Sequence, residues 1–160
     1  MFVCTVRGSS VRFFLLLVLS VVAFAAIVLI GGSESVYAMA DGKTVRYSGV
    51  KSEEDRIAFL GQFDIQVKTE SGKEESFTMA ESLDRVLLGY NEMQKKQGLD
   101  LSKYTRKRVT RYTYEVTNSP AEGAVFVNIL VYRGRVIAGD VASADPDGFV
   151  MPLCDFVAKK

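Results

Sequence analysis

The chain of 160 residues has no histidine, no tryptophan and only two cysteines. Without histidine it cannot build a Ser-His-Asp or Cys-His catalytic site, a zinc site with histidine ligands, or a histidine proton relay. Its 20 lysines and arginines against 19 aspartates and glutamates leave a net charge of +1, which is too close to neutral for a dedicated nucleic-acid-binding protein. We therefore expect no enzyme, no cofactor and no nucleic-acid partner.

One long hydrophobic run stands near the N-terminus. Residues 13–30 read FFLLLVLSVVAFAAIVLI, in which Ser20 is the only polar residue. As a helix this run is about 27 Å long, close to the roughly 30 Å thickness of a bilayer core. Arg7 and Arg12 precede it and the next basic residue is Lys43. This bias predicts an N-terminus in the cytoplasm and a C-terminal part outside the membrane.

The sequence therefore predicts four segments. Residues 1–12 are a cytoplasmic N-terminus, 13–30 a transmembrane anchor, 31–42 a flexible spacer, and 43–160 an extracytoplasmic domain. A cleaved signal that yields a secreted domain is the alternative, because the three residues that end at Ala40 read AMA, a small-x-small cleavage pattern. The length of the apolar run favours the uncleaved anchor, and both alternatives export the domain.

The two cysteines fall on opposite sides of the membrane in this topology. Cys4 lies inside and Cys154 outside, so no intrachain disulfide is expected. Cys154 stands in an apolar stretch beside Asp155, whose charge would raise the thiol pKa, so a small buried side chain is expected rather than a reactive thiol. Pairing with a cysteine of another chain stays open.

Two amphipathic helices are predicted in the exported domain. The first begins at Ser52, whose hydroxyl can accept an N–H of the first turn, and ends near Gly61. The second runs from about Thr78 to Gly98 and carries an apolar stripe that must cover another element. This stripe consists of Leu83, Val86, Leu87, Tyr90 and Met93.

Strands are predicted on both sides of the second helix. The first two are short and are separated by a polar turn at 70–75. Helices first and most strands later, joined by hairpins, predict an α+β fold: a mainly antiparallel sheet with two helices packed on one face, preceded by one N-terminal transmembrane helix. The strands are placed at 64–68, 76–79, 109–116, 124–132, 135–141 and 149–153.

Two stretches of the sequence resemble a known family. They are YNEMQKKQGLDLSKYTRKRVTRYTYEV at 90–116 and VNILVYRGRVIAGDV at 127–141. They are similar to an uncharacterised family of membrane-anchored proteins from Gram-positive bacteria, the domain of unknown function 4830, in which a helix with YN and Q runs into GxDL, a Tyr-rich strand and a hairpin that ends in GD. The resemblance covers roughly 52–153. It implies a membrane-tethered extracytoplasmic domain and carries no activity or catalytic residue.

A basic run with interleaved tyrosines is the first candidate surface. Outside a cell it could meet anionic lipid headgroups, an anionic wall polymer or an envelope protein. The alternative is a solvated face neutralised by nearby acids, because basic and acidic residues balance in the exported part. The candidate interaction surface consists of Tyr104, Arg106, Lys107, Arg108, Arg111 and Tyr112.

A polar cluster at the end of the second helix is the other candidate. Asn91, Gln94 and Asp100, with Asp140 from a distant strand, could orient a peptide or sugar in a small pocket. The alternative is that these groups satisfy helix-end carbonyls and loop N–H groups. Asp140 follows a glycine in an apolar strand and is expected partly buried, beside Arg133 or Arg135, or at the strand edge.

The last third of the chain contains four aspartates, whose carboxylate oxygens would suit calcium. They are Asp140, Asp145, Asp147 and Asp155. Asp145 and Asp147 lack the next ligand of a calcium loop, because Phe149 stands there, so no metal site is expected.

The exported domain is therefore interpreted as a non-enzymatic binding or interaction module at the cell envelope. The alternative from another class is a carboxylate-dependent cell-wall hydrolase. Such an enzyme needs two acids within about 5–10 Å of each other in one cleft.

Overall fold

The computed structural model describes residues 36–38 and 44–157. The predicted cytoplasmic N-terminus at 1–12 and the predicted anchor at 13–30 lie outside these residues. Within the described ranges, no helix has both the length and the apolar character needed to cross a bilayer.

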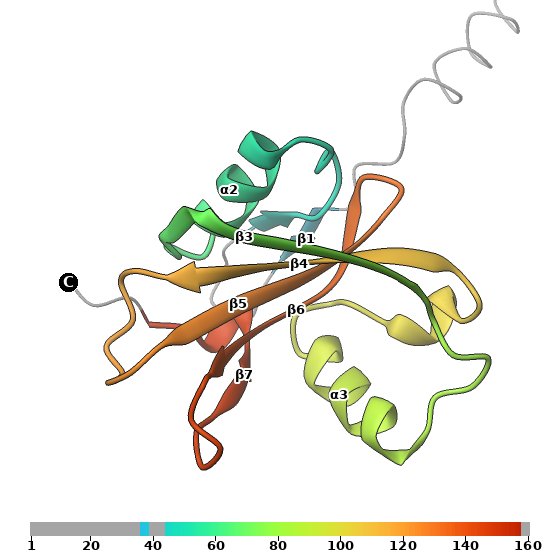
Figure 1. Cartoon of the computed structure of the whole chain (residues 1–160). Helices are drawn as coiled ribbons and strands as arrows, with labels where there is room; N and C mark the ends of the chain where they lie inside the picture. The colour runs from blue at the N-terminus through green and yellow to red at the C-terminus, as the bar shows by residue number, and fades with distance from the viewer. Residues whose placement is uncertain (1–35, 39–43, 158–160) are drawn as a thin grey trace, which may run out of the picture. The chain divides into compact units, whose positions relative to one another are not determined.

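Five antiparallel strands form the main sheet, in the order β3-β4-β5-β6-β7 (Figure 1). Each strand pairs with the strand that follows it along the chain, and every pair is antiparallel. The predicted α+β fold with a mainly antiparallel sheet is confirmed. The strands are β3 Val67–Thr78, β4 Arg108–Val116, β5 Val125–Tyr132, β6 Arg135–Ser143 and β7 Val150–Pro152.

A second, two-stranded sheet precedes the main one. It pairs β1, Val36–Ala38, with β2, Thr44–Arg46. Residues 36–38 belong to the segment predicted as a flexible spacer, yet they form a strand. The spacer was predicted from the glycine and serine around these residues. Val36 and Tyr37 are residue types that favour strands, but a run of three is too short to stand out.

The first predicted helix is confirmed as α2, Glu53–Gly61. Ser52 accepts a hydrogen bond from Asp55 N at 3.2 Å, and Asp55 Oδ2 accepts one from Ser52 N at 2.8 Å. This capping box satisfies N–H groups that the helix itself leaves unpaired. The backbone N–H groups of Ser52 and Lys51 also hold the pKa of Asp55 below its ordinary value.

The prediction of two short strands around a polar turn is wrong. Residues 67–78 form the single strand β3, with a bulge between Lys68 and Lys73. β3 has a neighbour on one side only, so its outer edge faces solvent. Charged residues suit such an edge strand, and the bulge breaks the alternation from which a strand is recognised.

The second helix is shorter than predicted and buries a different face. α3 spans Arg85–Lys95 and is capped by Asp84, which accepts from Leu87 N at 2.8 Å. Thr78, the predicted start, is the last residue of β3. Val86 in the predicted apolar stripe is 79% exposed, and the buried residues of α3 are Asn91 and Gln94.

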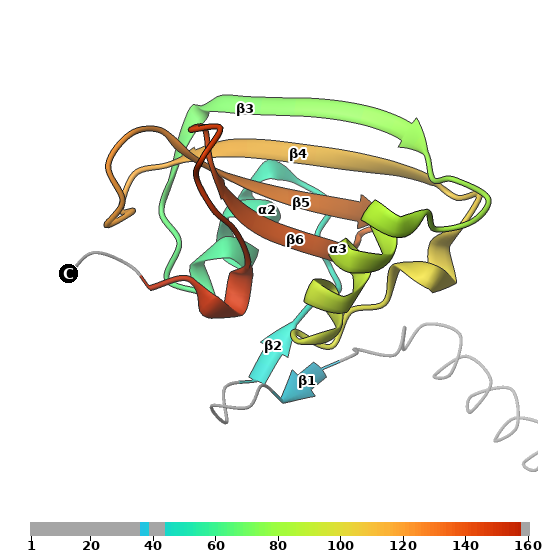
Figure 2. The same cartoon turned by 90° about the horizontal axis from the view of Figure 1, so that it is seen from below.

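The two helices contact opposite faces of the sheet, so the prediction that both pack on one face is wrong. In α2, Arg56 Nε donates to the hydroxyl of Tyr114 at 2.8 Å. In α3, Tyr90 donates to Asp140, which lies opposite Asn128 on the other face. Figure 2 shows α2 behind the sheet and α3 in front of it. Because β5 is apolar on both faces, each face needs its own cover.

A pair of buried side-chain amides holds α3 against the edge of β6. Gln94 Oε1 accepts from Gly139 N at 2.9 Å, and Gln94 Nε2 donates to Gly139 O at 3.1 Å. Gln97 Nε2 donates to the same carbonyl at 2.7 Å. β7 pairs only with residues 140–142 of β6, so these amides take the place that a neighbouring strand would occupy at Gly139. We call this contact the amide clamp.

Glycine is required at position 139 by the other side of the sheet. A Cβ there would lie 2.6 Å from Leu153 Cδ1, in the helical turn η2, Leu153–Asp155. Leu153 is fully buried. The absence of a side chain thus lets η2 and α3 both approach β6 at this residue.

We expect Gln94→Met to lower the free energy of unfolding by about 1–3 kcal/mol, because the N–H of Gly139 is left buried without an acceptor. The measurement is urea unfolding followed by the near-ultraviolet circular dichroism of the tyrosines. Gln66→Met, at an exposed position, is the matched control. Equal stability of the two variants would show that the amide clamp does not hold α3.

Candidate functional site

A cavity of about 530 Å³ lies between α3 and the face of the sheet that α3 covers. It exists because none of residues 85–90, in the first half of α3, is buried, whereas Asn91 and Gln94 in the second half are. The second half of α3 is thus packed against the domain, whereas the first half is exposed apart from Leu87 and Tyr90, which are half-buried. We call this cavity the α3 groove. Its apolar walls are Phe77, Met79, Val86, Leu87, Leu101 and Leu130.

The polar groups of the α3 groove gather around one carboxylate. Asp140 is 6% exposed, and its Oδ1 accepts from the Tyr90 hydroxyl at 2.6 Å. Its Oδ2 accepts from Asn128 Nδ2 at 2.9 Å. The hydroxyl of Thr113 donates to Asn128 Oδ1 at 2.7 Å and completes the chain of hydrogen bonds. Residues from α3, β5 and β6 therefore meet at one point of the groove, and Thr113 of β4 supports Asn128 from behind its lining.

Burial raises the pKa of Asp140 above the ordinary value of an aspartate. The hydrogen bonds from Tyr90 and Asn128 and the charge of Arg111 act in the opposite direction but do not overcome it. The pKa of Tyr90 is raised as well, first by burial and then by the Asp140 charge, so Tyr90 stays a donor. A buried carboxylate with a raised pKa in a cavity is a typical feature of a functional site.

Arg111 is the second charged residue that lines the groove. Its Nη2 is paired with Glu75 Oε2 across the β3–β4 ladder, and its side chain is 45% exposed. The pair lies where solvent reaches it, whereas Asp140 lies deep. The two charges of the groove therefore have very different surroundings.

The predicted interaction surface is not one surface. Arg111 and Tyr112 are neighbours in β4 and so point to opposite faces. The ring of Tyr112 lies 3.9 Å from the guanidinium carbon of Arg56 in α2. Tyr104, in the helical turn η1, Leu101–Tyr104, packs edge-on against Tyr132 with ring centres 5.6 Å apart. Both tyrosines thus serve the packing of the domain.

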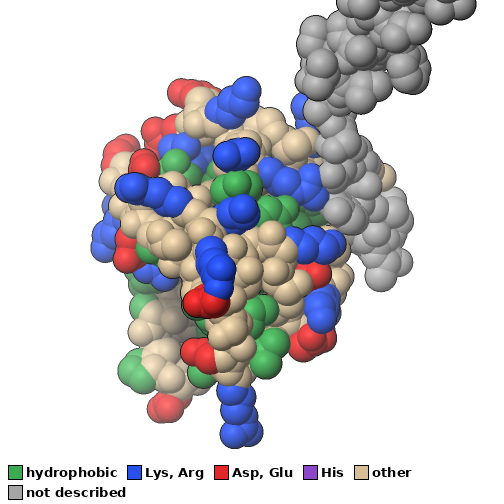
Figure 3. All heavy atoms as spheres, turned by 90° about the vertical axis from the view of Figure 1, so that its right-hand side faces the viewer, with side chains coloured by type: hydrophobic (Ala, Val, Ile, Leu, Met, Phe, Trp, Pro, Cys, Tyr) green, Lys and Arg blue, Asp and Glu red, His purple; other side chains and the backbone are tan. Residues whose placement is uncertain are grey.

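The three remaining cations of that run, Arg106, Lys107 and Arg108, are exposed. Arg106 pairs with Glu81 in the loop before α3. Figure 3 looks onto the side of the domain that carries η1 and the start of β4, and it shows Lys and Arg side chains spread over this side with acidic ones among them. The charges are interspersed, as expected for a solvated face.

The predicted polar cluster is brought together only in part. Asn91 Nδ2 donates to Asp100 Oδ1 at 3.1 Å, and Asn91 Oδ1 accepts from Leu101 N at 2.7 Å. Asp100 also accepts from Ser102 N at 3.1 Å. Gln94 belongs to the amide clamp. These contacts satisfy backbone groups at the end of α3, which is the alternative that the sequence left open.

Asp140 has other neighbours than the sequence predicted. In the β5–β6 ladder Arg135 lies opposite Tyr132, at the far end of the strand from Asp140. The guanidinium of Arg133 lies over the ring of Tyr132, 5.3 Å from its centre. The polar partners Tyr90, Asn128 and Thr113 were missed. The only signal for one of them was Asn128, a single polar residue in an apolar strand.

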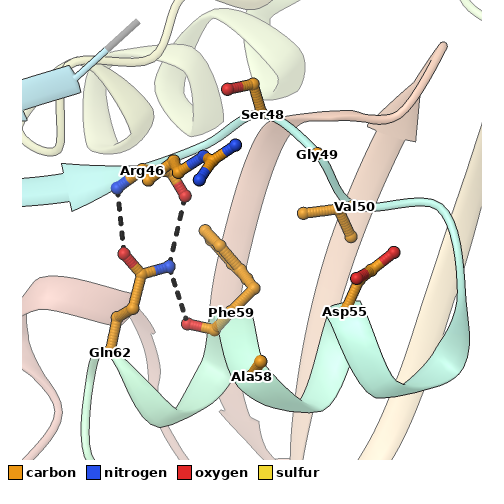
Figure 4. Close-up of a pocket in the computed structure, with 8 residues that line it drawn as sticks. All are labelled: Arg46, Ser48, Gly49, Val50, Asp55, Ala58, Phe59 and Gln62. Atoms are coloured by element: carbon orange, nitrogen blue, oxygen red, sulfur yellow. Dashed lines mark hydrogen bonds between the residues drawn. The ribbon is translucent and has the colours of Figure 1, made fainter. Parts of the chain in front are cut away.

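A second cavity, of about 310 Å³, lies between α2 and residues 46–50 (Figure 4). Gln62 spans it, since its Oε1 accepts from Arg46 N at 2.9 Å and its Nε2 donates to Arg46 O at 3.2 Å. Asp55, the acid of this cavity, already caps α2. Gln62 and Asp55 are engaged in these contacts, and Ser48 Oγ is a buried polar atom of this cavity without a partner. The α3 groove is larger and holds a buried carboxylate, so it is the better candidate site.

Acidic residues do not converge in three cavities of the described part. The α3 groove, the cavity beside α2 and a third of about 210 Å³ near the C-terminus are each lined by one acid: Asp140, Asp55 and Asp155 respectively. Among the residues that the structure describes, no three His, Cys, Asp or Glu side chains are grouped as a metal site requires.

Cys154 is half-buried and lies 3.5 Å from Asp155 Oδ1. Burial and the Asp155 charge raise the pKa of its thiol to about 11. The thiolate is the nucleophile, so the thiol is poorly reactive at neutral pH, for the reason that the sequence suggested.

A family model described as "Domain of unknown function (DUF4830)" matches residues 59–141, more than half of the chain. The matched stretch contains α3, β3 to β5, β6 as far as residue 141 and every residue that lines the α3 groove. No curated protein and no solved structure shows significant similarity to this chain.

Asp140 should make the stability of the domain depend on pH. Because its pKa is raised in the folded state, its contribution is fully present below the unfolded-state pKa of about 3.9 and is lost as the pH rises through the raised value. The difference in unfolding free energy between the wild type and Asp140→Asn should therefore fall as the pH rises through this window. Urea unfolding at a series of pH values measures it.

Asp147→Asn, in an exposed turn, removes the same charge and is the control. A wild type that gains stability over Asp140→Asn as the pH rises would contradict the prediction, because it would mean that the fold favours the ionised form of Asp140.

Proposed function

The chain belongs to the family of the domain of unknown function DUF4830, as the resemblance in its sequence implied, and we propose that its C-terminal domain is a non-enzymatic binding module of the cell envelope. The observation that carries the proposal is the α3 groove. It is an open cavity of about 530 Å³ with apolar walls and a few polar groups gathered at one place. This combination of size and lining is typical of ligand-binding sites.

The first half of α3, residues 85–90, supports the same function because apolar side chains are exposed there. Val86 at the rim of the groove is 79% exposed. Apolar side chains left in water beside an apolar cavity are common where a ligand or partner covers them. The amide clamp holds the other half of α3, so a ligand can enter under the helix without unfolding it.

The binding module is exported and tethered in this proposal. Residues 13–30 form a single transmembrane anchor with a cytoplasmic N-terminus, and the domain lies on the outer side of the cell membrane. The exposed cations Lys107 and Arg108 are then available to an envelope protein or an anionic wall polymer, beside Arg106, which is paired with Glu81. The secreted form, cut after Ala40, is the alternative.

A carboxylate-dependent hydrolase is the less favoured function. Its chemistry needs two acids across one cleft, and the α3 groove, like the two other cavities named above, offers one. In the groove, moreover, Asp140 is held by Tyr90 and Asn128 in a fixed arrangement suited to recognition.

The α3 groove should bind small apolar molecules. A neutral alkyl diazirine alcohol, irradiated with the full chain in lipid nanodiscs, should label groove residues, which mass spectrometry maps. Leu87→Ala should raise the probe concentration for half-maximal labelling by about fivefold, because it removes roughly 1 kcal/mol of apolar contact. Leu88→Ala, the same change at a residue that does not line the groove, should leave this concentration unchanged. Equal labelling of the two variants would rule out the groove as the site.

The proposed topology is tested by an alkaline phosphatase reporter fused after Lys160. We expect an active reporter, and we expect protease added to wall-stripped cells to cut the domain while residues 13–30 stay in the membrane fraction. An inactive, protease-resistant fusion would place the domain in the cytoplasm and remove the envelope function. Release of the domain from the membrane would favour the secreted form.

A further inference from the structure

The two charged residues that line the α3 groove, Arg111 and Asp140, are not paired with each other. Arg111 is paired with Glu75, so this pair is neutral as a whole. Asp140 is 6% exposed, and both of its hydrogen bonds come from neutral groups, the Tyr90 hydroxyl and the Asn128 amide. The charge of Arg111 lowers the pKa of Asp140 but does not overcome the effect of burial, so the buried carboxylate is compensated only in part and has no ion-pair partner among the described residues.

The Asp140 carboxylate also has unused hydrogen-bonding capacity. A carboxylate offers about four acceptor positions, and two of them are filled here. A buried charge without a counterion is costly, and the cost falls when a cation is placed against it. A positively charged hydrogen-bond donor in the groove would fill the free acceptor positions of Asp140 and would also compensate its negative charge.

The apolar walls of the groove determine which kind of ligand body fits beside the charged group. Between the exposed Val86 at the rim and the buried Asp140 at the deep end, the groove is lined by Leu87 and Leu130. These side chains offer no hydrogen bonds, so they favour an apolar body of modest size that follows the charged group into the groove.

We propose that the ligand of the α3 groove is a small amphipathic cation: its apolar body packs between Leu87 and Leu130, and its protonated primary amine donates to the free acceptor positions of Asp140. This inference rests on the proposed binding function and adds the chemical class of the ligand to it. Asp140 is the residue that discriminates, because an uncharged or anionic head group cannot compensate its charge.

Competition between three molecules with one apolar body tests the charge. The full chain in nanodiscs is labelled with the neutral diazirine alcohol, and cyclohexylmethylammonium, cyclohexylmethanol or cyclohexanecarboxylate is added as competitor. The ammonium should halve the labelling of groove residues at about a tenfold lower concentration than the alcohol, because a charge-assisted hydrogen bond replaces a neutral one. The carboxylate should be the weakest of the three.

Asp140→Asn should remove the tenfold advantage of the ammonium over the alcohol, and Asp147→Asn, on an exposed turn, should retain it. The order of the three competitors on the wild type decides the question even if Asp140→Asn does not fold. An alcohol or carboxylate that competes as well as the ammonium would overturn the inference and leave the binding function standing. Absence of groove labelling by the neutral probe would instead overturn the binding function itself.

Discussion

The amide clamp between Gln94 and Gly139 is the interaction on which the arrangement of the domain depends. The pairing of β6 with β7 stops at Asp140. Without another partner, the backbone N–H and carbonyl of Gly139 would be buried and unpaired. The amide of Gln94 satisfies both the N–H and the carbonyl of Gly139. A helix is thereby attached to a sheet edge through polar contacts, and its apolar residues are left free for another purpose.

The position of the clamp explains the position of the groove. The second half of α3 is held by the amide clamp, and in the first half only Tyr90 reaches the sheet, so a cavity is left beneath Val86 and Leu87. The same sheet face brings Asp140 and Asn128 to the deep end of that space. Burial of the Asp140 charge costs stability, and proteins commonly retain such a cost at a functional site.

The sequence predicted the elements that depend on local rules. Ser52 and the acids after it mark the start of α2, and the hairpin strands of the C-terminal third follow from their alternation and turns. α3 was predicted as an amphipathic helix that buries its apolar stripe, and here the local rule failed. Its buried side chains are polar because Gln94 pairs with the backbone edge of β6 and Asn91 with the loop after the helix, and no hydrophobic pattern can reveal such partners.

The sequence alone determined the fold class, the positions of most strands along the chain and the family. It also gave the list of polar residues from which a site could be built. Tertiary structure alone decided which of them meet. The Arg133-Gly134 turn pairs Tyr132 with Arg135, and this register would put Asn128 opposite Gly139; an irregularity between Leu130 and Val131 shifts it by one residue and puts Asn128 opposite Asp140. Such a shift moves a side chain to the other face of the sheet, so one extra residue in β6 placed the carboxylate under α3.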